Sequence, residues 1–115
     1  MIIPSSGTRL HLALEPVDLR GSFNALSARV KSVLQADPLS GQWFVFTNRR
    51  RNRLKLLFWD GTGLWVATKR LERGGYNWPG GPGVQRELQA AEWSNLLHGL
   101  EVTSRKGWYR REPKA

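Results

Sequence analysis

The chain has 115 residues and a mass of 13.1 kDa, with no cysteine and a formal net charge of +9 from 18 basic and 9 acidic side chains. Its hydrophobic fraction of 40% excludes a disordered basic tail, and its length suits one domain with a single core. Disulfides are excluded, no apolar run is long enough to cross a membrane and the first residues lack the pattern of a secretory signal, so we expect a cytoplasmic protein.

The first third of the sequence predicts a strand followed by a helix. Leucines at alternate positions predict a half-buried strand over residues 8–14. Apolar residues then recur every three or four positions, which predicts a helix over residues 20–36. Asp18 or Ser22 can cap this helix, and Pro38 follows its end.

The middle of the sequence predicts a three-stranded meander. Runs rich in aromatic, β-branched and leucine residues occupy 43–47, 54–59 and 64–69. The connections, 48–52 and 60–63, have the length and composition of hairpin turns. The basic triplet in the first connection is therefore expected at an exposed hairpin tip.

The last part of the domain predicts a loop and a second helix. Residues 74–83 hold five glycines and two prolines, a composition typical of a loop. Helical spacing returns over residues 88–98, with Gly99 expected just past the helix end. We expect one α+β domain over residues 1–104, in which a small antiparallel sheet (the three-stranded meander plus the N-terminal strand) packs with two helices. Residues 105–115 are expected to form a flexible basic tail.

Basic residues concentrate in two blocks of the sequence. Residues 49–73 carry eight basic and two acidic side chains, and residues 105–115 carry five basic and one acidic. Clustered positive charge is typical of proteins that neutralise phosphates. The alternative is that the arginines only keep a small domain soluble. A membrane-surface role is disfavoured because the charges do not follow one amphipathic helix.

The sequence offers little for catalysis. The carboxylates form none of the spacings used for metal-assisted hydrolysis, and His11 and His98 are isolated from each other and from a third ligand. No serine lies in a nucleophile-elbow motif. We therefore expect no enzymatic activity, no metal and no cofactor.

Binding of nucleic acid fits the sequence better, because arginine binds phosphates in a bidentate manner and tryptophan stacks on bases. We expect Trp43, Trp78 and Trp93 in the core. Whether Trp65 shares a sheet face with Trp59 or with Phe58 depends on the strand register. The residues predicted to contact nucleic acid in the domain are Arg49, Arg50, Arg51, Arg53, Lys55, Lys69, Arg70, Arg73 and Trp59. Weaker contacts are predicted from the tail residues Arg105, Lys106, Arg110 and Arg111.

The run DPLSGQWFVFTNRRRNRLKLLFWDGTGLWVATKRLERGGYNWP, over residues 37–79, closely resembles the TnpB-type, or Orf2-like, accessory protein of insertion-sequence-66 elements. The resemblance extends over roughly residues 4–100. Two departures are the glycine-rich GGPG at 80–83 and Gln89, where the family leads us to expect a serine or threonine cap. The resemblance implies a small cytosolic protein that is encoded beside a larger transposase and another small accessory protein, its expected partners, and that is needed for movement of the element.

We therefore expect a non-catalytic accessory protein of DNA transposition that binds transposon ends or non-specific duplex through a basic hairpin. The alternative is a protein adaptor that docks on the transposase without binding DNA itself. RNA binding is a third, weaker possibility. The sequence leaves base specificity and oligomeric state open.

Overall fold

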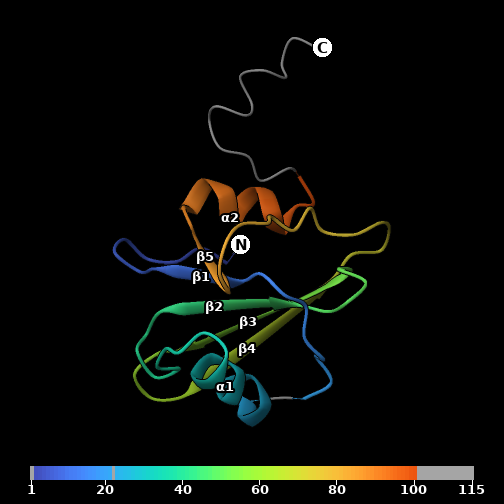
Figure 1. Ribbon diagram of the computed structural model, residues 1–115. Coiled ribbons are helices and arrows are strands. Elements are labelled where there is room, and N and C mark those ends of the chain that lie inside the picture. Colours follow the sequence, from blue (N-terminus) through green and yellow to red (C-terminus); the bar gives the residue numbers. More distant parts are fainter. Residues whose placement is uncertain (1, 22, 101–115) are drawn as a thin grey trace.

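The computed structural model describes residues 2–21 and 23–100, and these form a mixed sheet with one helix on each face (Figure 1). The strands lie in the order β4-β3-β2-β1-β5. The elements, in chain order, are β1 (Leu10–Ala13), α1 (Phe23–Ser32), β2 (Trp43–Thr47), β3 (Arg53–Trp59), β4 (Leu64–Arg70), β5 (Gln85–Leu88) and α2 (Ala90–Leu97). The predicted α+β class is confirmed. None of the described helices is long and apolar enough to cross a membrane.

The sheet buries both of its faces. On one face Trp93, Leu96 and Leu97 of α2 pack on a cluster that contains Val45 and Leu56. On the other face α1 residues Leu26 and Val30 pack on Phe44, Phe46 and Leu57. All five residues of β2 are buried because this central strand has a helix on each side. Its continuous apolar sequence, WFVFT, follows from that position.

The expected antiparallel sheet is corrected to a mixed one. β1 pairs with β2 in parallel, with Leu10 opposite Trp43 and Leu12 opposite Val45. The chain between them contains α1, because parallel neighbours need a crossover and cannot be joined by a tight turn. The β2-β3-β4 meander is antiparallel, as predicted.

Strand β5 was not predicted from the sequence: the loop was expected over residues 74–83 and the second helix over 88–98, and residues 85–87 were assigned to no element. Residues Gln85–Leu88 pair antiparallel with β1, and α2 begins only at Ala90. β5 is a short edge strand with a mostly polar sequence. It therefore lacks the alternation of apolar and polar residues that predicts a strand. At the start of α2 the Glu92 carboxylate accepts the Gln89 backbone N–H at 2.8 Å. Gly99, with φ of +75°, ends the helix as expected.

Helix α1 is shorter than predicted. It ends in a backbone motif in which the Ala36 N–H donates to the Val30 carbonyl and Gln35 takes a φ of +53°. Asp18 does not cap the helix, since its carboxylate binds Arg20, and Ser22 lies outside the described residues. The spacing of apolar residues therefore predicted a longer helix, over residues 20–36, than the one that forms.

The predicted aromatic core is confirmed for Trp43 and Trp93, which are 8% and 2% exposed. Their rings meet edge to face at 6.2 Å, and Trp43 also stacks on Phe58 at 4.9 Å. Trp78 is only partly buried at the margin of this cluster, where its indole N–H donates to the Ala13 carbonyl at 2.8 Å.

Candidate nucleic-acid interface

The turn between β2 and β3 is held closed by Asn48. The Asn48 Oδ1 accepts the backbone N–H groups of Asn52 and Arg53, each at 3.1 Å, and its carbonyl accepts the Arg51 N–H at 3.0 Å. The Asn48 amide also donates to Asn52 Oδ1 at 2.8 Å. Arg51 adopts a φ of +57°, which this network maintains in a residue other than glycine. The basic triplet therefore lies on a turn with a defined shape.

The loop after β4 is hydrogen-bonded to this turn. The N–H groups of Leu71 and Tyr76 donate to the carbonyls of Asn52 and Arg51 at 2.9 and 2.6 Å. A Cβ at Gly75 would lie 3.1 Å from the Arg51 carbonyl oxygen, so glycine is suited to this close approach. Tyr76 is 4% exposed, and its hydroxyl donates to the Lys69 carbonyl at 3.2 Å. The turn is thus attached to the core.

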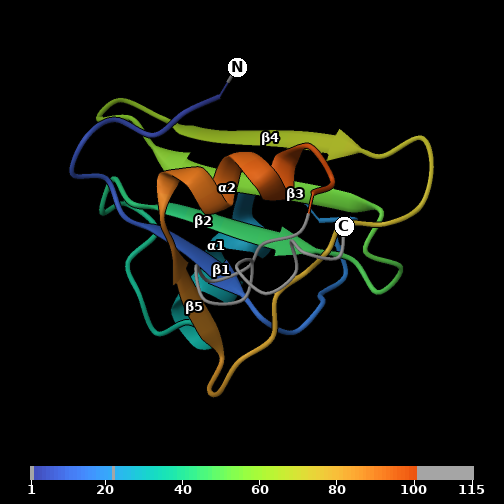
Figure 2. The ribbon, with the colours of Figure 1, turned by 90° about the horizontal axis from the view of Figure 1, so that it is seen from above.

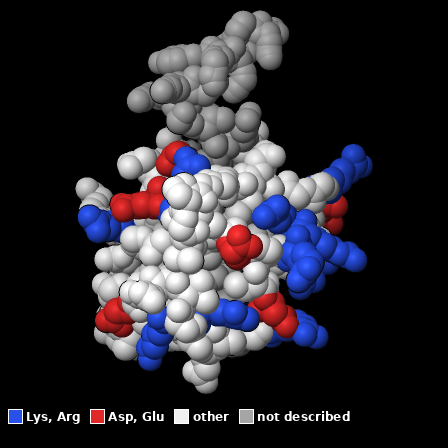
Figure 3. All heavy atoms as spheres, viewed as in Figure 1, with Lys and Arg blue, Asp and Glu red and all other residues white. Residues whose placement is uncertain are grey.

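Figure 3 shows lysine and arginine side chains gathered on the side of the molecule where, in Figure 1, the β2–β3 turn and the loop after β4 lie. Arg49, Arg50, Arg51 and Arg53 are all exposed in this region. The predicted hairpin tip is confirmed as a surface feature.

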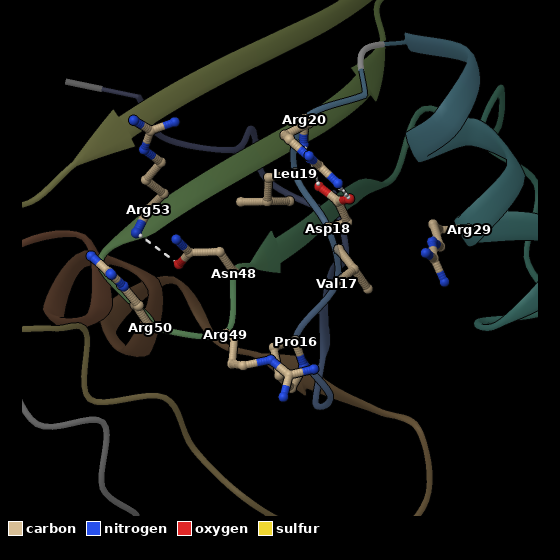
Figure 4. A pocket seen from close by; sticks show the side chains of 10 residues that line it. All are labelled: Pro16, Val17, Asp18, Leu19, Arg20, Arg29, Asn48, Arg49, Arg50 and Arg53. Atoms are coloured by element: carbon tan, nitrogen blue, oxygen red, sulfur yellow. Dashed lines mark hydrogen bonds and ion pairs between the residues drawn. The ribbon is translucent and has the colours of Figure 1, made fainter.

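A cavity of about 600 Å³ opens between this turn, the segment before α1 and α1 itself. Figure 4 shows the side chains around it, and its charged members come from three separate parts of the chain. The lining residues are Pro16, Val17, Asp18, Leu19, Arg20, Arg29, Asn48, Arg49, Arg50 and Arg53. We call this cavity the arginine basin. Arg20 and Arg29 were not among the residues predicted from the sequence, because they belong to a stretch with little net charge and reach the basin only through the fold.

Among the described residues that line the basin, Asp18 is the one carboxylate, and it is already paired. The Arg20 guanidinium donates hydrogen bonds from two nitrogens to the Asp18 carboxylate, from Nη2 to Oδ2 at 2.7 Å and from Nε to Oδ1 at 3.0 Å. Hydrogen bonds from the Arg20 side chain and backbone lower the pKa of Asp18 to about 2. Asp18 is therefore ionised at neutral pH and balances Arg20. Within the described part of the chain, Arg29, Arg49, Arg50 and Arg53 form no ion pair, so the basin keeps an excess of positive charge.

Two lysines predicted to contact phosphates have structural partners. The Lys55 ammonium donates to the carbonyls of Leu19 and Gly21 at 2.6 and 3.1 Å. The Lys69 ammonium donates to the Leu97 carbonyl at the end of α2, at 2.6 Å. Lys55 thus connects β3 to the segment before α1, and Lys69 connects β4 to the end of α2. Their contact with phosphates stays a prediction.

The aromatic candidates do not join the arginines. Trp59 ends β3 and Arg53 begins it, so the two are separated by about 20 Å along the strand. The register places Trp65 opposite Phe58, and the two rings stack with centroids 6.1 Å apart. Trp65 is 55% exposed, and its indole N–H donates to Asp60 at 2.7 Å. Trp59 lies on the opposite face, which answers the question that the sequence left open.

The remaining predicted residues either do not line the basin, although Arg70 pairs with the basin residue Arg53, or lie outside the described residues. Arg70 is 3.7 Å from the Glu72 carboxylate, and both side chains are exposed. Arg73 lies in the exposed loop after β4. The tail residues Arg105, Lys106, Arg110 and Arg111 lie outside the described residues. Among residues 2–21 and 23–100 there is no group of three or more histidine or carboxylate side chains that could hold a metal ion.

The chain matches the family model described as IS66 Orf2 like protein over residues 8–107. It is 42% identical to Uncharacterized protein y4jC of Sinorhizobium fredii (strain NBRC 101917 / NGR234) over 103 residues, which are 90% of this chain and 88% of that protein. It is 37% identical to Uncharacterized protein y4hO of the same organism over 101 residues, which are 88% of each chain. No solved structure matches the chain.

The bonds of Lys55 predict a loss of stability when its ammonium is removed. Lys55→Met keeps the aliphatic stem but leaves two carbonyls without their charged donor. The free energy of unfolding measured in urea should therefore decrease by about 1–2 kcal/mol. Lys31→Met is the control, because Lys31 is exposed on α1 and should change stability little. Equal stability of the two variants would contradict the structural role of Lys55.

Tyr76 predicts a loss of stability at alkaline pH. Burial raises the pKa of its phenol to about 12, whereas the phenol of the unfolded chain ionises near pH 10. Below pH 10 the phenol is neutral in both states. As the pH rises toward 12, only the unfolded state gains the phenolate, so the Tyr76 contribution to stability is lost. Between pH 10 and 12, the free energy of unfolding measured in urea should decrease less steeply for Tyr76→Phe than for the wild type. Parallel curves would refute this assignment.

Proposed function

We propose that this chain, which belongs to the IS66 Orf2-like family, binds DNA through the arginine basin and the adjoining hairpin tip. Membership makes it a transposition-associated accessory protein. In this proposal it is a non-catalytic component that contacts transposon ends or duplex near them, together with the element's transposase and the other accessory protein.

The observation that carries the proposal is the convergence of arginines from three segments on one cavity with one paired carboxylate. Arg20 precedes α1, Arg29 lies on α1, and three further arginines come from the β2–β3 turn and the first residue of β3. Guanidinium groups match the oxygens of a phosphate in a bidentate geometry. Because four of the five are not neutralised by a carboxylate in the described chain, a polyanion would supply the missing counter-charge.

The turn geometry favours such a contact. Its backbone is fixed by Asn48 and by the Tyr76 N–H, so less conformational freedom is lost when phosphates bind. Phosphate contacts hold a protein on duplex DNA without reading its sequence. We therefore propose that Arg49, Arg50, Arg53 and Arg29 contact the backbone, with Arg51, Arg70 and Arg73 at the periphery. The tail arginines and lysine would add a weaker attraction.

The second candidate is an adaptor that docks on the transposase. It is favoured by Trp65, which is exposed on the α2 face far from the arginines. Tryptophan is enriched at the centres of protein interfaces. In this reading DNA affinity is negligible until transposase is present, and the basic groups face an acidic protein surface.

The hairpin tip can be tested by a salt titration. Replacing Arg49, Arg50, Arg51 and Arg53 together with alanine removes up to four phosphate contacts. The slope of log affinity against log salt on duplex DNA should then become shallower by about three to four units. The loss should be similar for unrelated sequences. An unchanged slope would exclude the tip as the DNA site, and absent DNA affinity with loss of transposase binding would favour the adaptor.

If the whole basin binds DNA, a residue outside the hairpin tip should also affect DNA affinity. Arg29→Ala should reduce the slope by about one unit, because Arg29 lines the same cavity although it lies on α1. Arg9→Ala is the matched control: Arg9 is an exposed arginine outside the basin, 3.8 Å from the Glu87 carboxylate. Equal slopes for the two variants would restrict the interface to the hairpin.

A further inference from the structure

β4 forms one margin of the sheet and leaves a complete edge without a neighbouring strand. It is the last strand in the order β4-β3-β2-β1-β5 and pairs only with β3 among the described strands. Figure 2 shows it as the outermost strand on its side of the sheet. With seven residues it is also longer than the opposite edge strand, β5, which has four.

The pairing with β3 shows which backbone groups point outward. At the connecting turn, the Asp60 N–H donates to the Gly63 carbonyl, and beyond β4 the Leu71 N–H donates to the Asn52 carbonyl. Since hydrogen-bonded and non-hydrogen-bonded pairs alternate along antiparallel strands, odd-numbered residues of β4 bond to β3. The N–H and C=O groups that face outward belong to Leu64, Val66, Thr68 and Arg70.

This edge lacks most of the features that prevent strand pairing. Its register with β3 runs without a bulge from Leu64 to Arg70, and the strand contains no proline. Lys69 and Arg70 are its charged residues, and both lie at one end. Regular edges of this length that have no neighbouring strand are templates for another strand.

We propose that a second copy of this chain pairs with β4 in antiparallel orientation, with the two-fold axis at Ala67. This register sets Leu64 opposite the partner's Arg70 and Val66 opposite the partner's Thr68. All four outward-facing residues then meet an outward-facing residue of the other copy, so every free backbone group of both edges finds a partner. The two five-stranded sheets become one continuous sheet.

The side chains suit this register. The two Ala67 residues meet at the axis as a non-hydrogen-bonded pair, where opposite side chains are closest and a small residue fits. Trp65 lies opposite the partner's Lys69, so no like charges are opposed. Moving the axis to Lys69 would set two lysines opposite each other. Moving it to Trp65 would pair fewer residues.

The dimer would place the two basic tips far apart. Arg70 lies beside the β2–β3 turn, and antiparallel pairing brings the turns of the two copies to opposite ends of a strand about 23 Å long. The positive charges of the two copies repel weakly at this separation, and salt screens the repulsion. Pairing of the edges and DNA binding are therefore separate properties, and the first is measured without DNA.

The test is sedimentation equilibrium of the full chain from about 5 to about 500 µM at about 0.3 M salt. The mass should rise from monomer to dimer. Val66→Pro removes an outward N–H without breaking a bond to β3 and should weaken dimerisation about ten- to a hundredfold. Glu87→Pro is the matched control, because it places the same change at an outward position of the other edge, in β5.

A second pair of variants tests the register without proline. Trp65→Lys puts a cation opposite the partner's Lys69, whereas Trp65→Glu puts an anion there, and both remove the same exposed ring. The lysine variant should dimerise at least severalfold more weakly than the glutamate variant. Thermal unfolding confirms that each variant is folded. A wild type that remains monomeric, equal effects of the two prolines, or equal effects of Lys and Glu would each overturn the proposal.

Discussion

The central constraint on this molecule is that its sheet is covered on both faces. β2 has no polar face, because Phe44 and Phe46 contact the α1 side while Trp43 and Val45 contact the α2 side. A small domain with two apolar layers has few places for basic residues. Most of the basic residues in the described part of the chain lie in turns, in loops, at strand ends or on α1, and Lys55 and Lys69 donate to backbone carbonyls. The basic hairpin is therefore a consequence of the two-sided core as well as a candidate binding feature.

The parts of the fold that the sequence predicted are those set by local pattern. The β2-β3-β4 meander follows from short apolar runs separated by Asn-rich and Asp-Gly turns, and Asp60 binds the turn amides of Thr62 and Gly63 as its position suggests. The parallel pairing of β1 with β2 was missed because the two strands are joined through a helix. β5 was missed because Gln85–Leu88 becomes a strand only through β1. Both errors concern contacts between distant segments.

The same distinction applies to the candidate site. Arg49, Arg50 and Arg51 were evident because they are adjacent in sequence. Arg20 and Arg29 were not, since their segment is nearly neutral overall and only the packing of α1 brings them to the basin. Charge counting also gave Lys55 and Lys69 the same weight as the arginines, although their ammonium groups bind main-chain carbonyls. A count of charges along a sequence cannot separate free cations from those with an internal partner.

The chemistry of the basin determines which conditions control its charge. Its cations are arginines, and a guanidinium group is charged throughout the physiological pH range. Its one carboxylate has a pKa of about 2 because Arg20 binds it, so the Asp18 charge is lost only in strong acid. The described residues that line the cavity include no histidine. The net charge presented to a phosphate is therefore constant across the physiological pH range, and ionic strength is the variable that changes its attraction. A basin of this composition suits continuous contact with a polyanion and would not release it in response to a change in pH.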